Sequence, residues 1–189
     1  MNVNESKDIG RCGCGRSPTG YCIGWHGLSE EEFKKKYGKS KAEMRKAMKE
    51  KPEPVKKVED RVANVGGAKL PVRIYTPDGN GLLPILMFFH GGGWVYGDLD
   101  SHDVPCRQLA NFGRMAVLAV DYRLAPEHPF PAPTDDGIAA FRHIRDNAAS
   151  FGADRERIAV GGDSAGGNIA AVVCQACRDA GEAGPAFQM

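Results

Sequence analysis

The sequence predicts an α/β fold in which a mostly parallel sheet is flanked by helices, with a small Cys-rich extension ahead of it. From about residue 55 onward, short apolar runs alternate with helical stretches, which is the pattern of strands joined by covering helices. The runs at residues 85–89, 115–120 and 158–160 are continuously apolar, as expected for strands buried on both faces. Two alternating runs, at residues 58–65 and 70–75, predict a hairpin at the start of the sheet.

Helices are predicted between these strands and ahead of them. Residues 102–113 and 165–180 have helical composition, and another helix begins at Thr134 and runs to about Phe151, where Gly152 is a stop signal. Residues 29–51 predict a charged helix that begins with a capping box of Ser29 and Glu32. The chain therefore divides into a Cys-rich segment (1–28), a charged helical linker (29–54) and the α/β domain (55–189).

Composition and charge exclude several classes of protein. A formal net charge of +1 gives no electrostatic case for binding nucleic acid. The apolar run at residues 82–89 is far shorter than the roughly 20 residues that a membrane-spanning helix needs. The first ten residues are polar and lack the apolar stretch of a signal peptide. We therefore expect a cytoplasmic protein without a membrane span.

The most informative motif is a G-x-S-x-G pattern, Gly162-Asp163-Ser164-Ala165-Gly166. It follows a buried strand and opens an Ala-rich helix, which is the context of a nucleophile elbow. The two glycines leave room for a sharp turn that exposes the Ser164 hydroxyl. We predict that Ser164 is a catalytic nucleophile. The structural alternative is a Gly-rich turn that begins a helix.

A second Gly-rich motif, His90-Gly91-Gly92-Gly93-Trp94, directly follows another buried strand. Ester hydrolysis places negative charge on the carbonyl oxygen, and preorganised backbone N–H groups are the usual means of stabilising it. We assign the N–H donors of this oxyanion hole to Gly91, Gly92 and Ala165. A phosphate-binding loop fits less well, because the sequence has neither GxxxxGK[ST] nor a GxGxxG that opens a helix.

Together with the segment Asp121-Tyr122-Arg123-Leu124-Ala125-Pro126-Glu127, these motifs resemble the three signature blocks of the hormone-sensitive lipase family of carboxylesterases. The resemblance covers about residues 56–180. It implies an α/β-hydrolase fold that hydrolyses small carboxylic esters, commonly with short acyl chains, and needs no cofactor for hydrolysis. It also implies that residues 121–130 support the site from beneath, that His90 anchors the oxyanion loop, and that Glu127 and His128 stand outside the triad.

The triad itself is incomplete in this sequence. In the resembled fold, an Asp or Glu and then a His follow the serine along the chain. Residues 165–189 contain no histidine, and their candidate acids, Asp179 and Glu182, lie at or beyond the end of the helix that follows Ser164. A serine without a general base is a poor nucleophile. We therefore expect this sequence to be the N-terminal part of the fold only, and the chain by itself to be inactive.

The N-terminal segment contains a different constellation, in which Cys12, Cys14, Cys22 and His26 place three thiols beside an imidazole. Such a set suits zinc or an iron–sulfur cluster. The segment resembles the CDGSH-type iron–sulfur domain, which implies a [2Fe-2S] cluster, although the interval between Cys14 and Cys22 is one residue short. A flexible segment without metal is the alternative. The remaining cysteines are expected to be small buried hydrophobes: Cys106, Cys174 and Cys177.

Two classes of function therefore remain open. The first is a serine esterase, and the second is a metal- or iron–sulfur-binding module fused to an inactive hydrolase fragment. The two differ in whether the chain continues into a strand that ends in Asp and a later loop that carries His. If no strand follows, residues 157–161 form an open sheet edge, through which we expect self-association. We also expect Val172 and Val173 to lack packing partners.

Overall fold

The computed structural model describes residues 31, 35, 52–65, 68–79 and 81–189. The predicted Cys-rich segment lies wholly outside the described residues, and the predicted helix over residues 29–51 lies outside them except at two positions. Residues 51–189 form one compact unit, which contains the predicted α/β domain.

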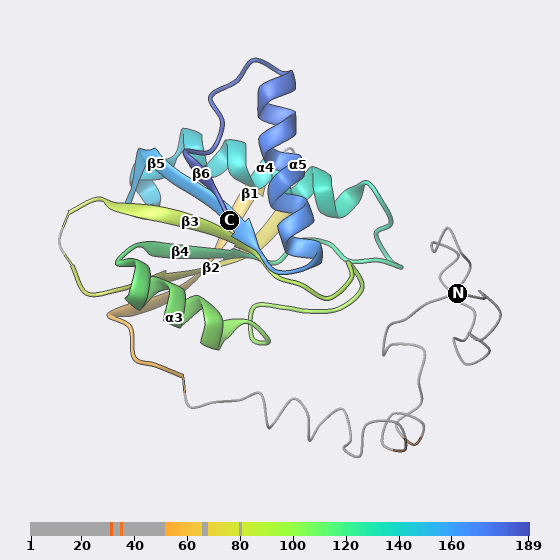
Figure 1. Cartoon of the computed structure of the whole chain (residues 1–189), viewed down its shortest axis with the longest axis horizontal. Coiled ribbons are helices and arrows are strands. Elements are labelled where there is room, and N and C mark those ends of the chain that lie inside the picture. The colour runs from red at the N-terminus through yellow and green to blue at the C-terminus, as the bar shows by residue number, and fades with distance from the viewer. Residues whose placement is uncertain (1–30, 32–34, 36–51, 66–67, 80) are drawn as a thin grey trace, which may run out of the picture. The chain divides into compact units, whose positions relative to one another are not determined.

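A mixed sheet forms the centre of this unit (Figure 1). Its strands within the described residues are β1 (Lys57–Val65), β2 (Ala68–Thr76), β3 (Leu83–Phe89), β4 (Ala116–Val120), β5 (Ala153–Gly162) and β6 (Phe187–Gln188), in the order β1-β2-β4-β3-β5-β6. β1 and β2 form the predicted hairpin, and β2 also runs antiparallel to β4. β4, β3, β5 and β6 are parallel, so the mostly parallel sheet is confirmed.

Helices cover both faces of the sheet. α3 (Asp103–Gly113) lies on one face, whereas α4 (Ala132–Asp146) and α5 (Ala165–Asp179) lie on the other (Figure 1). The strand β3 shows why its sequence is continuously apolar: Ile85, Met87 and Phe89 join the core beneath α4 and α5, while Leu86 and Phe88 join the core beneath α3. Both sides of each central strand therefore need apolar side chains.

The predicted helix over residues 134–151 is divided in the structure. α4 ends at Asp146, and a 3-10 helix, η2 (Ala148–Phe151), follows it. The interruption is at Asn147, whose side-chain amide donates a hydrogen bond to the carbonyl of His143 at 2.9 Å and caps the end of α4. Gly152 ends η2 with a φ of 69°, so the predicted stop signal is confirmed.

The expectation of an open edge on β5 is wrong. Residues 186–189 pair with that strand, and the N–H groups of Ala186 and Met189 donate to the carbonyls of Ile158 and Val160 at 2.8 and 3.0 Å. A strand as short as β6 has no periodicity that a sequence pattern could reveal. The expectation that Val173 lacks partners is also wrong, because it is fully buried beside α4. Beyond β5, the edge strand among the described residues is therefore β6, and β1 is the edge strand on the opposite side.

Candidate active site

Ser164 lies at the junction of β5 and α5, on the strand-to-helix turn that its motif predicts. Its backbone has φ 52° and ψ −113°, a region that non-glycine residues rarely occupy and that stores about 1–3 kcal/mol of strain. The residue is exposed, although Ala165 and Gly166 directly after it are buried. The turn thus presents the hydroxyl at the end of the sheet where the parallel strands finish.

The glycines on either side of Ser164 are required by a close approach of two backbones. A Cβ atom on Gly162 would lie 2.2 Å from the carbonyl oxygen of Phe89, and one on Gly166 would lie 1.8 Å from the same atom. The start of α5 therefore rests directly on the end of β3. This contact brings the serine turn next to the loop that follows Phe89, which is the loop of the second motif.

The oxyanion loop, defined here as residues 90–94, begins where Phe89 pairs in register with Gly162. The N–H of Gly91 donates a hydrogen bond to Oδ1 of Asp163 at 2.9 Å. Gly92 and Gly93 both have positive φ angles, 125° and 62°. In the described part of the chain, the N–H groups of Gly92, Gly93 and Ala165 have no hydrogen-bond partner. The three N–H groups therefore remain available to a ligand.

His90 is the buried first residue of this loop, and its side chain contacts the residue that follows it. The imidazole stacks on Tyr122 with the ring centroids 4.3 Å apart, and its Nδ1 lies 2.8 Å from the carbonyl oxygen of Gly91. Burial lowers the pKa of His90, so the ring is neutral at pH 7 and Nδ1 carries the proton that it donates to the carbonyl. These contacts match the anchoring role that the resemblance implied and leave no exposed base at this position.

The third motif clamps both ends of the oxyanion loop. The Tyr122 hydroxyl donates to the carbonyl of His90 at 2.6 Å, and the Ala125 N–H donates to the carbonyl of Trp94 at 2.8 Å. This segment is itself held by the buried carboxylate of Asp136, which accepts hydrogen bonds from the backbone and guanidinium of Arg123. Residues 121–125 therefore support the site, as expected.

Sequence reasoning missed two carboxylates that organise the site, Asp136 and Asp163. Asp136 lies on the buried face of α4. A charged residue among the apolar residues of that face is the sequence signal that could have identified it. Asp163 stood inside the recognised motif, but its neighbour Gly91 is 72 residues away in the sequence. Only the pairing of β3 with β5 brings the two together.

No general base is hydrogen-bonded to Ser164 within residues 52–65, 68–79 and 81–189. The two candidate acids, one at the end of α5 and one just after it, have other partners. Asp179 pairs with Arg178, and Glu182 accepts from Arg142 and Arg145 on α4. The described residues therefore do not form a catalytic triad of serine, histidine and an acid.

The predicted metal ligands Cys12, Cys14, Cys22 and His26 lie outside the described residues. Where side chains are described, no group of three or more His, Cys, Asp or Glu residues could hold a metal ion. The same part of the chain contains no helix that is long and apolar enough to cross a membrane. Cys106 and Cys177 are buried as expected, Cys174 is half-buried, and burial raises the pKa of all three thiols.

Comparison with known proteins gives a consistent result. Residues 86–189 match the family model described as α/β-hydrolase fold. The carboxylesterase NlhH of Mycobacterium tuberculosis is 48% identical over 138 residues, which cover 72% of this chain and 43% of the relative. The carboxylic ester hydrolase LipN of the same organism is 54% identical over 112 residues, covering 59% of this chain and 30% of the relative.

Solved structures agree with these relatives. An ester hydrolase from the metagenome of Lake Arreo, complexed with a bipyridine phosphonate derivative, has a TM-score of 0.76 and 55% identity over 86% of this chain and 51% of its own. An esterase of Pyrobaculum calidifontis has a TM-score of 0.72 and 41% identity over 84% of this chain and 50% of its own. The chain spans about half, or less, of the length of these relatives. Since the family model matches more than half of the sequence, the chain belongs to the α/β-hydrolase fold family.

Proposed function

We propose that this chain contributes the nucleophile and the oxyanion hole of a carboxylic ester hydrolase. In this proposal the Ser164 hydroxyl attacks the ester carbonyl, the alcohol departs, and water then releases the acid from the acyl-enzyme. The observation that carries the proposal is the strained backbone of Ser164, at φ 52° on the junction of β5 and α5. Strain of this kind is retained chiefly where function uses it.

We propose one change to the oxyanion hole that the sequence predicted. The Gly91 N–H already donates to Asp163, so it is not free to stabilise a substrate. We assign the donors instead to Gly92, Gly93 and Ala165, whose N–H groups have no partner among the described residues. Removing one such donor from a serine hydrolase lowers kcat roughly 10²–10³-fold.

The substrates proposed are small esters with short acyl chains, and the reaction requires no cofactor. The relatives support the hydrolysis of carboxylic esters, because they carry the names carboxylesterase and carboxylic ester hydrolase, and the short acyl chains follow from the family resemblance. The general base and its carboxylate have to come from outside the described residues, since none of these supplies a histidine to Ser164. We therefore expect the 189-residue chain alone to turn over esters negligibly.

Complementation tests this proposal. The chain is to be extended with the C-terminal half of the 55%-identical ester hydrolase, and p-nitrophenyl butyrate hydrolysis measured for the chain alone, the extended protein and its Ser164→Ala variant. We expect turnover only in the extended protein with Ser164 intact, and an unchanged rate in a control Ser150→Ala variant on the exposed turn after α4. Turnover by the extended Ser164→Ala variant at the unmodified rate would contradict the proposal.

A further inference from the structure

The carboxylate of Asp163 joins the nucleophile turn to the oxyanion loop. Its Oδ1 accepts the Gly91 N–H at 2.9 Å and lies 3.2 Å from Nε2 of His102. Asp163 is the residue directly before Ser164, so the same short turn carries the nucleophile and the acceptor that holds the loop. A hydrogen bond to an ionised carboxylate is shorter and about twice as strong as a neutral one.

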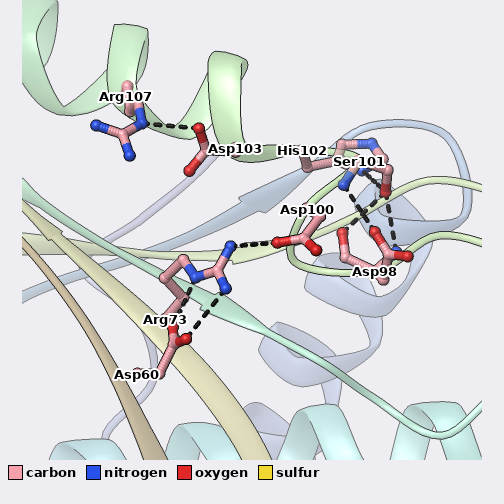
Figure 2. Close-up of polar contacts among 8 residues, drawn as sticks. All are labelled: Asp60, Arg73, Asp98, Asp100, Ser101, His102, Asp103 and Arg107. Atoms are coloured by element: carbon pink, nitrogen blue, oxygen red, sulfur yellow. Dashed lines mark hydrogen bonds and ion pairs between the residues drawn. The ribbon is translucent and has the colours of Figure 1, made fainter. Parts of the chain in front are cut away.

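His102 reaches this carboxylate from the start of α3, and its own position is fixed by a compact turn. Figure 2 shows Ser101 between Asp98 and His102, with Oγ of Ser101 3.0 Å from Nδ1 of His102. The Ser101 N–H donates to Asp98 Oδ1 at 2.7 Å, and the Asp98 N–H donates to Ser101 Oγ at 2.9 Å. Since Nδ1 faces the serine, Nε2 is the nitrogen that meets Asp163.

This turn is also tied to the sheet. Arg73 of β2 donates through Nη1 to Asp100 at 2.7 Å and through Nε to Asp60 of β1 at 2.6 Å (Figure 2). The Arg73 side chain is only 18% exposed, so its position is set by packing as well as by charge. The loop that carries His102 is therefore supported by the sheet.

We propose that Asp163 is a positioning residue of the oxyanion hole: its carboxylate, oriented by His102, holds the Gly91 N–H and so directs the N–H groups of Gly92 and Gly93 toward a carbonyl oxygen at Ser164. This inference rests on the proposed function. It explains why the first loop glycine has its N–H engaged while the next two remain free. It also assigns a role to His102, which lies outside the three sequence motifs.

The same contact explains why position 91 is glycine. A Cβ atom there would lie 2.1 Å from Oδ2 and 2.9 Å from Cγ of Asp163, whereas the nearest backbone atom, the carbonyl oxygen of Asp163, would be 3.1 Å away. An alanine at position 91 therefore displaces the carboxylate. If the carboxylate is absent, most of that conflict disappears, so the two positions should be energetically coupled.

The test uses the full chain and two readouts. The first is the rate at which diethyl p-nitrophenyl phosphate modifies Ser164, followed by intact mass. The second is the amide resonance of Gly91 in protein labelled with ¹⁵N-glycine. We compare Asp163→Ala, Asp163→Asn and His102→Ala, with Asp179→Asn as a matched control at an exposed carboxylate.

We expect Asp163→Ala to lower the rate about tenfold to a hundredfold, less than deleting a donor outright, because the donors are misdirected rather than lost. Asp163→Asn should stay within about threefold, since its amide oxygen still accepts the Gly91 N–H. His102→Ala should lie between them, and the control should be unchanged. The Gly91 resonance should move in Asp163→Ala. An Asp163→Ala rate equal to that of the unmodified chain, or an Asp163→Asn rate as low as that of Asp163→Ala, would overturn the inference.

A double-mutant cycle with Gly91→Ala adds an independent check. We expect Gly91→Ala to lower the rate in the unmodified chain and to have little further effect in the Asp163→Ala background. Strictly additive effects would count against the inference. If the chain reacts too slowly at Ser164 for rates to be compared, the Gly91 resonance decides, and an unmoved resonance in Asp163→Ala refutes the positioning role. The proposed function fails separately, if the extended protein with Ser164 intact does not hydrolyse the ester.

Discussion

Replacing Gly166 with alanine should destabilise the domain, although the same change in most helices is stabilising by about 1 kcal/mol. The new Cβ would lie 1.8 Å from the carbonyl oxygen of Phe89, 2.5 Å from its carbonyl carbon and 2.8 Å from the carbonyl oxygen of His90. All three are backbone atoms, so no side-chain rotation relieves the conflict. Either α5 or the end of β3 has to move by more than 1 Å, roughly, to reach ordinary contact distance.

Overpacking of this kind costs about 1–3 kcal/mol where side chains can adjust, and here the backbone must shift, so we expect a loss of about 3 kcal/mol in the free energy of unfolding. For a domain of this size that corresponds to a fall in Tm of roughly 6–12 °C. Urea denaturation and calorimetry measure both quantities. Gly167→Ala is the matched control in the next position of α5, where the nearest atom to a new Cβ is the Gly162 oxygen at 3.1 Å.

The control should change stability by less than about 1 kcal/mol, because the helix preference for alanine offsets a mildly tight contact. Equal stability of Gly166→Ala and the unmodified chain would refute the close approach of α5 to β3. So would a larger loss in Gly167→Ala than in Gly166→Ala.

Three further predictions concern acid sensitivity, the sheet edge and the N-terminal cysteines. Burial lowers the folded-state pKa of His90 below the unfolded value of about 6.5, so the neutral ring stabilises the fold above that pH and this stabilisation is lost as the pH falls. Urea titrations at pH 7.5 and 5.5 should therefore show a smaller difference in the free energy of unfolding for His90→Asn than for the unmodified chain. Phe187 on β6 is 65% exposed, so we predict that the chain self-associates and that Phe187→Lys reduces the association, as measured by sedimentation. An unmodified chain that stays monomeric would contradict this prediction. The hypothesis of an N-terminal metal site, as opposed to a segment without metal, predicts zinc or iron in the purified protein that Cys12→Ser and His26→Ala diminish, and the absence of both metals after anaerobic reconstitution would exclude the site.

The central strands and the two Gly-rich motifs could be predicted from the sequence because their signals are local. Residues 85–89 are apolar at every position, since β3 is covered on both faces, and this leaves a pattern that needs no tertiary information. The serine turn follows from glycines at fixed spacing after a strand. These signals also locate the loop after Phe89 next to Ser164, because both follow parallel strands.

The parts that could not be predicted depend on long-range contacts. The engagement of the Gly91 N–H by Asp163 depends on the register between β3 and β5, which the sequence does not specify. The pairing of β6 with β5 involves two residues, too few for any periodicity. The burial of Val173 depends on how α5 packs against α4, and its place in an Ala-rich helix does not determine it.

The proposed role of Ser164 as the nucleophile is tested most directly by the site of covalent modification in the folded chain. An active-site-directed fluorophosphonate is to be incubated with the native chain and with the chain unfolded in urea, followed by peptide mass spectrometry. Ser164 is exposed next to N–H groups that have no partner among the described residues and that can stabilise the oxygen of the reagent. We therefore predict that the reagent modifies Ser164 in the native chain ahead of every other serine, and that unfolding removes this preference. Modification of Ser164 at the same rate in the native and unfolded chains would contradict the proposed role of Ser164.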